Sequence, residues 1–168
     1  HRTPRHGHMA KIEITDLQDH VHLDKKTILQ VVRHVMKEEG RAAKSLSVVL
    51  TDNRHIRDLS NEYLRRDAVT DVISFPLEDP EWPEGHYSNN GSINGEIIAS
   101  AERAYYQAQA IHGNPEAELL LYIVHGLLHL IGYDDRTAQD ARQMHAREDV
   151  LLSQLGFPCV YAGQASVQ

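Results

Sequence analysis

Apolar residues recur along this 168-residue chain with two periods, and segments of the two kinds alternate. Short runs in which every second residue is apolar, or which are apolar throughout, predict β-strands, whereas apolar residues three or four apart predict helices. The expected strands cover residues 11–15, 46–50, 71–77 and 93–100, and the expected helices cover residues 24–39, 53–66, 102–112, 115–131 and 137–155. This interleaving predicts a mixed α/β layer architecture, although the pattern does not give the order of the strands.

Polar, proline and glycine residues mark the ends of several expected helices. Asp24 and Asn114 are expected N-caps, and Pro115 follows at the first helical position, where its missing N–H costs nothing. Gly40 and Gly113 are expected to end two helices, because glycine readily takes the backbone conformation that follows a helix.

The length and composition indicate one domain, since a chain of this size can bury about two-thirds of its unfolded surface. We expect the domain to cover residues 9–168. Residues 1–8 (HRTPRHGH) show no periodicity, and we expect a disordered tail or a cloning remnant there. Residues 79–92 (DPEWPEGHYSNNGS) are rich in Pro, Gly and Asn and contain acidic residues but no Lys or Arg, which predicts a mobile, solvated loop.

The charge and the single cysteine narrow the possible functions. The chain has 17 basic and 24 acidic residues and a net charge of −7, the wrong sign for holding nucleic acid by bulk charge, so any contact with RNA must be local. Cys159 is the only cysteine, which excludes an internal disulfide and fits a reducing compartment. No run approaches the roughly 18 apolar residues of a membrane helix, and no positively charged start leads into a signal segment. We therefore expect a cytoplasmic protein without membrane contact.

The segment from His125 to Asp135, HGLLHLIGYDD, places two imidazoles four residues apart in an otherwise apolar helix. Residues at this spacing project from one face, so His125 and His129 can bind one ion. Without a second cysteine, such a site must use imidazole and carboxylate ligands. The alternative is a pair of core histidines held neutral by hydrogen bonds. A buried ring nitrogen without a partner costs about 1–3 kcal/mol, however, and a shared cation satisfies one nitrogen on each ring.

A third ligand can reach this pair from the turn that follows the helix. Gly132 ends the helix three residues after His129 and allows the chain to reverse. We expect Asp135 to be the third ligand, with Asp134 and His145 as alternatives. Asp134 can instead accept a hydrogen bond from a ligand histidine or be only a turn residue, and His145 can be an ordinary surface histidine.

The spacing H-x-x-x-H-x-x-G-x-x-D also matches the metzincin zinc motif, in which the third ligand is His. A zinc peptidase needs a glutamate after the first histidine as general base, and Gly126 occupies that position here. The sequence thus keeps the metal ligands and lacks the peptidase carboxylate.

The same segment resembles the signature motif of the YbeY-type endoribonucleases, H-G-x-L-H-L-x-G-Y-D-H, at ten of its eleven positions. LSNEYLRRDAVTDVISFPLE is similar to the family's L-N-x-x-Y-R-x-K-D-x-P-T-D-V-L-S-F-P, and NGEIIASAERAYYQA to its G-D-I-V-I-S-x-E-x-A. The likeness covers most of residues 45–157. It implies an α/β fold of mixed α+β type, with a small four-stranded mixed sheet, about five helices, and a metal site between a buried helix and the following turn.

The resemblance implies one zinc ion, or another divalent metal, on His125, His129 and Asp135. It also implies cleavage of single-stranded RNA in the maturation of the small-subunit rRNA 3′ end and in ribosome quality control. The implied partners are small-subunit rRNA, the ribosomal small subunit and assembly factors. Asp135 stands where the family has His. Because a carboxylate leaves the ion less positive than a third imidazole would, we expect a reaction that is slower or needs a higher pH.

A second departure from the family lies at Leu64, where the family has Arg. Arg65 is one residue further along and Arg66 matches the family's Lys. We expect these two guanidiniums to bind phosphate during catalysis, with Arg65 in the missing role. The alternative is a solvated charge run at the end of a helix.

Four other positions are weaker candidates. The resemblance suggests that Ser74 and Thr70 line the substrate groove, although hydroxyls at a strand end are usually structural. Met144 and Glu148 match the family's closing helix, and we expect them to be packing and capping positions.

The sequence therefore predicts a metal-dependent endoribonuclease, with two alternatives. A non-catalytic, metal-binding ribosome assembly factor is favoured by Leu64, Asp135 and the negative net charge. A zinc metallopeptidase is favoured by the ligand spacing and disfavoured by Gly126.

Overall fold

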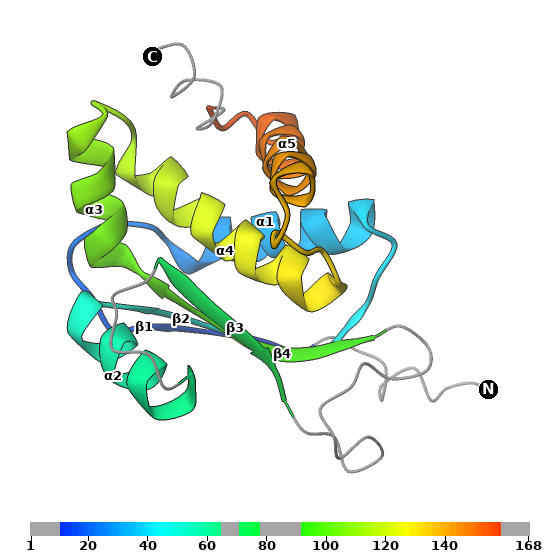
Figure 1. Ribbon diagram of the computed structural model, residues 1–168, viewed down its shortest axis with the longest axis horizontal. Helices are drawn as coiled ribbons and strands as arrows, with labels where there is room; N and C mark the ends of the chain where they lie inside the picture. Colours follow the sequence, from blue (N-terminus) through cyan, green and yellow to red (C-terminus); the bar gives the residue numbers. More distant parts are fainter. Residues whose placement is uncertain (1–10, 65–70, 78–91, 159–168) are drawn as a thin grey trace.

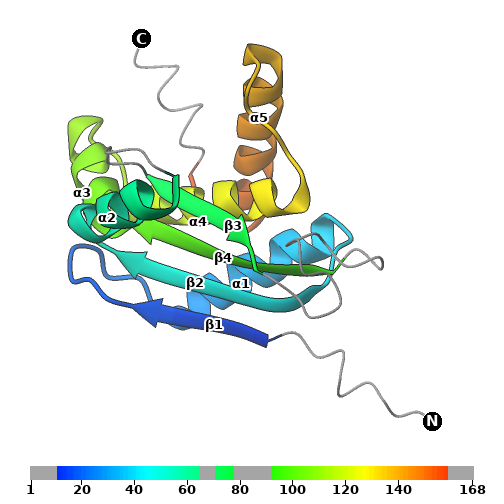
Figure 2. The ribbon, with the colours of Figure 1, turned by 60° about the horizontal axis from the view of Figure 1, so that its bottom comes forward.

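The computed structural model describes residues 11–64, 71–77 and 92–158, which form a four-stranded sheet with helices on both faces (Figure 1; Figure 2). In chain order the elements are β1 (Lys11–Asp16), α1 (Lys25–Glu38), β2 (Ala43–Thr51), α2 (Asn53–Leu64), β3 (Val72–Pro76), β4 (Ile93–Ser100), α3 (Ala101–Ala110), α4 (Pro115–Ile131) and α5 (Ala138–Gln154). The predicted fold class is confirmed. Residues 1–8 and most of the predicted loop at 79–92 lie outside the described residues. Within the described part of the chain, no helix is long and apolar enough to cross a membrane.

The strands lie in the order β1-β2-β4-β3, with β1, β2 and β4 parallel and β3 antiparallel to β4 at one edge. β4 leads directly into α3, because Ser100 ends the strand and its hydroxyl caps the helix by accepting from the N–H of Arg103 at 3.0 Å. The N–H of Ser100 donates to the carbonyl of Asp71, immediately before β3, at 2.9 Å. The start of α3 and the start of β3 therefore lie side by side.

The histidine-bearing helix α4 lies across one face of the sheet, against β3 and β4 (Figure 1). α1 packs beside it, and α5 packs over α1 and α4. α2 covers part of the opposite face, where Ile56 packs with Ile73 and Ile98. α4 is thus enclosed by the sheet and by helices, which explains why its sequence is apolar nearly all round.

Most helix ends follow the predicted signals. Asp24 caps α1 by accepting a hydrogen bond from the N–H of Thr27, and Asn114 caps α4 by accepting from two N–H groups of the first turn. One prediction is wrong: Gly113 is not the residue that reverses the chain after α3. The helix ends at Ala110, and His112 takes the left-handed conformation with φ of 53°.

α4 approaches the sheet closely at Gly126. A Cβ at this position would lie 2.9 Å from Cγ2 of Ile97 and 3.2 Å from Cγ2 of Val72, and Ile97 is fully buried. A residue without a side chain lets the helix lie at this distance. Gly126 therefore sets the depth at which the neighbouring His125 lies in the molecule.

We predict that Gly126→Val lowers the free energy of unfolding by about 1–3 kcal/mol, because the added methyl groups overpack the contact with Ile97. Denaturant unfolding followed by circular dichroism measures this cost. In the double variant Gly126→Val/Ile97→Ala the valine enters the space left by Ile97, so the combined cost is smaller than the sum of the single costs. Additive costs would contradict the close contact.

Candidate metal centre

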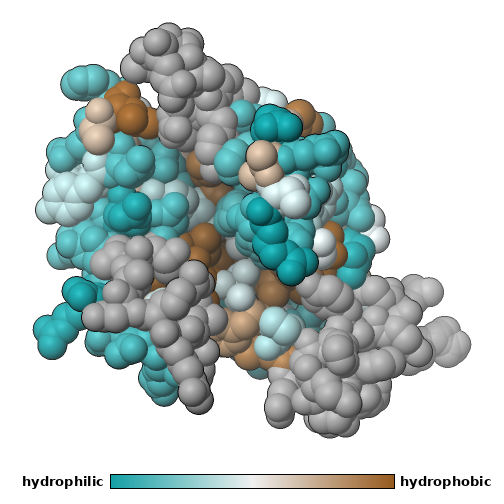
Figure 3. All heavy atoms as spheres, viewed as in Figure 1, coloured by the Kyte–Doolittle hydropathy of each residue, from teal (hydrophilic) through white to brown (hydrophobic). Residues whose placement is uncertain are grey.

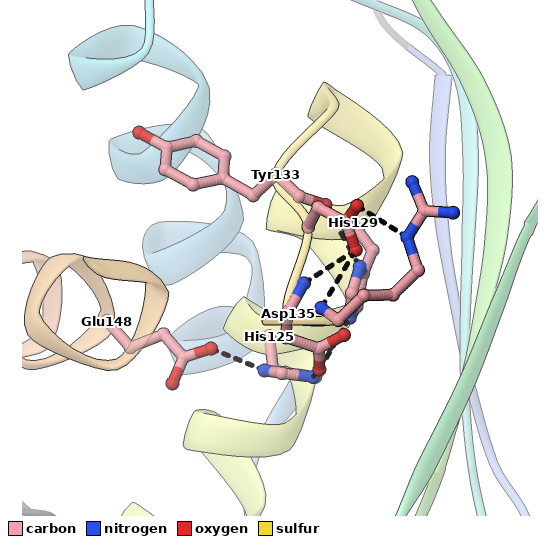
Figure 4. A network of polar contacts seen from close by, with 7 residues as sticks. His125, His129, Tyr133, Asp135 and Glu148 are labelled. Carbon is pink, nitrogen blue, oxygen red and sulfur yellow. Dashed lines mark hydrogen bonds and ion pairs between the residues drawn. The ribbon is translucent and has the colours of Figure 1, made fainter. Parts of the chain in front are cut away.

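The two predicted ligand histidines lie on one face of α4, one turn apart (Figure 4). Their rings meet edge to face with centroids 4.6 Å apart, and Nε2 of His125 lies 3.1 Å from Nε2 of His129. Only 20% of the His125 side chain and 30% of the His129 side chain are exposed. The helix therefore holds two ring nitrogens of partly buried side chains close together.

Gly132 turns the chain back toward the histidines. Its φ of 124° lies in the region that favours glycine, and the N–H of Tyr133 donates to the carbonyl of Leu128 at 2.9 Å. The Tyr133 hydroxyl donates to Glu39, just after α1, at 2.8 Å. Arg147 of α5 donates to the other oxygen of the same carboxylate at 2.6 Å. The turn is thus attached to two helices.

Asp135 returns to the histidine pair. Its Oδ2 lies 3.4 Å from Nε2 of His125 and 3.4 Å from Nε2 of His129. A tetrahedral ion bound at about 2.0–2.1 Å holds its ligand atoms about 3.3–3.4 Å apart. The three separations observed here, 3.1, 3.4 and 3.4 Å, are close to that value, so the cluster can hold one metal ion.

In each histidine, the hydrogen bond of Nδ1, the outer nitrogen, determines whether Nε2, the inner nitrogen facing the other ring, carries a proton (Figure 4). Nδ1 of His129 donates to the carbonyl oxygen of Tyr133 at 3.1 Å, and Nδ1 of His125 donates to the Glu148 carboxylate at 2.5 Å. A neutral imidazole carries one proton, so both Nε2 atoms are left with lone pairs. Two lone pairs at this distance repel each other unless a positive charge lies between them.

The carboxylates around His125 attract positive charge to the cluster. Burial alone would lower the pKa of His125, but the hydrogen bond and charge of Glu148, with a contribution from Asp135, raise it above its ordinary value. A field that favours an added proton also favours a divalent cation, and the two compete for the same nitrogen.

The structure separates Asp135 from the other two candidates for the third ligand. Asp134 accepts from the backbone N–H groups of Asp135 and Arg136 and from the Arg136 guanidinium, so it belongs to the turn. The ring centroid of His145 lies 6.5 Å from that of His125. Among the described residues, His145 is not part of the three-ligand group.

The predicted packing of Met144 and Glu148 is confirmed, but the prediction that Glu148 is a capping position is wrong. Both residues are fully buried, and Glu148 lies in the middle of α5 with its carboxylate on His125. The signal was in the sequence, because Met144, Glu148 and Leu151 share one helical face. A glutamate on an apolar face requires a polar partner in the core.

A cavity of about 320 Å³ lies beside the cluster. Its lining comes from the start of β3, from α3, α4 and α5, and from the turn: Asp71, Val72, Arg103, Gln107, Glu118, Leu121, Tyr122, His125, Asp135 and His145. In the space-filling view, a hollow with apolar atoms at its floor lies over α4 and β3 (Figure 3). Two of the three candidate ligands thus line a space that can admit part of a substrate.

The structure describes only some of the remaining predicted site residues. Ser74 lies in β3 and does not line the cavity. Arg65, Arg66 and Thr70 lie outside the described residues, and Leu64 is the last residue of α2. The roles expected of the two arginines stay predictions.

Comparison with known proteins gives a family model and close relatives. A model described as Endoribonuclease YbeY matches residues 13–156. The Endoribonuclease YbeY of Carboxydothermus hydrogenoformans is 38% identical over 148 residues, 86% of this chain and 97% of that protein. The Endoribonuclease YbeY of Salinibacter ruber is 38% identical over 131 residues, which cover 78% of this chain and 83% of that protein. The solution structure of a Thermotoga maritima protein is similar in fold, with a TM-score of 0.53, 21% identity, and coverage of 88% of this chain and 91% of that one.

We predict that Glu148→Gln weakens zinc binding by about 10- to 100-fold, because the carboxylate that orients His125 and strengthens it as a ligand is lost. Competition with a chromophoric chelator measures the affinity, and thermal unfolding of the metal-free protein checks that the variant folds. Glu38→Gln is the matched control, since Glu38 is an exposed residue at the end of α1. Equal affinities for the two variants would show that Glu148 does not support the site.

Proposed function

Because the chain belongs to the YbeY endoribonuclease family, we propose that it is a zinc-dependent enzyme that cleaves single-stranded RNA. The observation that carries the proposal is the triangle of His125 Nε2, His129 Nε2 and Asp135 Oδ2, whose sides match the ligand spacing of a tetrahedral ion. Two features support zinc: the donor set of two imidazoles and one carboxylate, and the short distances between the three ligand atoms.

In this proposal the protein holds three ligands in place before substrate arrives. A divalent ion bound by them supplies a Lewis acid that polarises water or a phosphoryl oxygen. Glu148 and the Tyr133 carbonyl hold the protons on the outer nitrogens, so that both inner nitrogens are ligands. Asp135 and His125 line the neighbouring cavity, which gives the RNA access to the same place.

The proposed substrate is ribosomal RNA of the small subunit, cut during maturation of its 3′ end and in ribosome quality control. The proposed partners are the small subunit and its assembly factors, in the cytoplasm. The support is the family resemblance of the motif segments. The net charge of −7 agrees with local contacts to RNA rather than with a broad basic surface.

Arg65 and Arg66 are the proposed phosphate-binding residues of the reaction. In the sequence they directly follow Leu64, the last residue of α2; Arg66 matches the family's Lys, and Arg65 is one residue beyond the position of the family's Arg. Guanidinium groups bind phosphate oxygens through two parallel hydrogen bonds, which positions a backbone without reading its sequence.

The geometry at Gly126 disfavours the peptidase alternative. A glutamate there would begin with a Cβ only 2.9 Å from Ile97, on the side of α4 that faces the sheet. The helix therefore has no room at this position for the carboxylate that a zinc peptidase uses. The non-catalytic assembly factor is the remaining rival, and cleavage assays separate the two.

We predict that the zinc-loaded protein cleaves a single-stranded oligoribonucleotide and that His125→Ala reduces the rate by about 100-fold or more, since it removes a ligand of the Lewis acid. A chelator abolishes cleavage by the wild type and zinc restores it. His34→Ala is the control, because His34 is a histidine of α1 bonded to Gln154. Zinc binding without cleavage would favour the assembly factor, and hydrolysis of unfolded protein would favour the peptidase.

We predict that Arg65→Ala raises KM for RNA by about 10-fold, the loss of one bidentate phosphate contact of roughly 1.5 kcal/mol, and leaves zinc affinity unchanged. Steady-state kinetics with a labelled oligoribonucleotide measures this effect. Arg54→Ala is the matched control, because Arg54 is exposed at the opposite end of α2. Unchanged cleavage by Arg65→Ala would exclude the role proposed for Arg65.

A further inference from the structure

Several polar residues that line the cavity are not among the three candidate metal ligands. Glu118 and Tyr122 of α4 line the cavity together with His125, and they precede it by two turns and one turn of the helix. Arg103 of α3 completes this wall. Polar groups on a helix that is otherwise buried and apolar require a polar partner, so their presence needs a separate explanation.

Two of these groups are buried to an unusual degree. The exposed fraction is 4% for both Glu118 and Tyr122. Burial, with the nearby carboxylates of Asp71 and Glu118, raises the pKa of Tyr122, so the hydroxyl keeps its proton. A hydrogen bond between the Tyr122 hydroxyl and Glu118 adds to this rise in pKa, so the two buried side chains are coupled to each other. A carboxylate has several lone pairs, so Glu118 can also accept a hydrogen bond from a ligand in the cavity.

Arg103 contributes hydrogen-bond donors, and the positive charge of its guanidinium is already balanced by an ion pair with Asp71. Its Nε donates to the carboxylate of Asp71, and 42% of its side chain is exposed. A guanidinium has five N–H donors, so the ion pair leaves others available to a ligand. Because Asp71, Glu118 and Asp135 also line the cavity, its carboxylates outnumber its guanidinium. This charge balance does not suit a second phosphate group.

A nucleobase matches this lining better than a phosphate does. The edge of a base is uncharged and carries hydrogen-bond donors and acceptors side by side. Glu118 is an acceptor and Arg103 is a donor. Leu121 and Val72 offer apolar contact to the ring faces. The cavity volume of about 320 Å³ is at the lower end of the range for small-molecule sites, roughly 300–1,000 Å³.

We infer that this cavity binds the base of a nucleotide next to the scissile phosphate, with Arg103 and Glu118 as specificity-determining residues. The inference rests on the proposed function, since it places RNA at the metal cluster. A base can enter the cavity only when its hydrogen-bonding edge is unpaired. The cavity therefore gives a physical reason for a preference for single-stranded RNA.

Cleavage of oligoribonucleotides that differ only in the bases beside the cut position tests the inference. We expect the wild type to prefer the best base over the poorest by about 5- to 100-fold, as one good set of base contacts provides. Glu118→Gln and Arg103→Gln should reduce this preference to less than about 3-fold. Glu116→Gln and Arg33→Gln are matched controls, because both residues are exposed and do not line the cavity. They should keep the wild-type preference.

Titration of the metal-free wild-type protein with the four nucleosides, followed by NMR, tests the cavity independently of cleavage. We expect shifts of resonances from Arg103, Glu118 and Tyr122 that saturate and that differ among the nucleosides. Nucleosides lack phosphate, so this result does not depend on whether the protein is a nuclease. Cleavage without base preference, a preference unchanged in both cavity variants, or no nucleoside shifts would each overturn the inference.

Discussion

Two imidazole lone pairs directed at one place on a buried helix are the constraint on which the rest of this structure depends. The Nε2 atoms of His125 and His129 lie 3.1 Å apart, and their outer nitrogens are committed to Glu148 and the Tyr133 carbonyl. Such a pair is stable only with a positive charge close by. Asp135 adds a negative charge and a third donor atom, so the three residues together could hold a metal ion.

The fold meets this constraint by enclosing α4 on several sides. Gly126 lets the helix lie close to β3 and β4, which fixes the depth of the pair. α5 passes over the helix and delivers a fully buried carboxylate to His125. α3 and the start of β3 add Arg103 and Asp71 to the neighbouring cavity. The residues that support the candidate ligands and line the cavity thus come from several elements packed on one sheet.

The sequence was enough to predict most helix ends, because these depend on residues close together in the chain. It was also enough for the fold class, from the alternation of the two periods, and for the family, from the motif segments. His125, His129 and Asp135 lie within eleven residues, so helix geometry and one glycine turn were enough to bring them together. Features that depend on distant segments could not be predicted in this way. The strand order and the contact of Glu148 with a residue 23 positions away follow from tertiary packing. The end of α3 also differs from the prediction, because His112 rather than Gly113 takes the left-handed conformation.

Glu39 shows that a motif contiguous in sequence need not be an autonomous module. All three candidate ligands lie in α4 and the turn after it, yet that turn is anchored to a carboxylate 94 positions earlier. Arg147 is bonded to the same carboxylate from 108 positions away. A fragment that contained α4, the turn and α5 would carry every candidate ligand and still lack the anchor that orients Tyr133. The complete centre therefore needs residues from both the first helix and the last one.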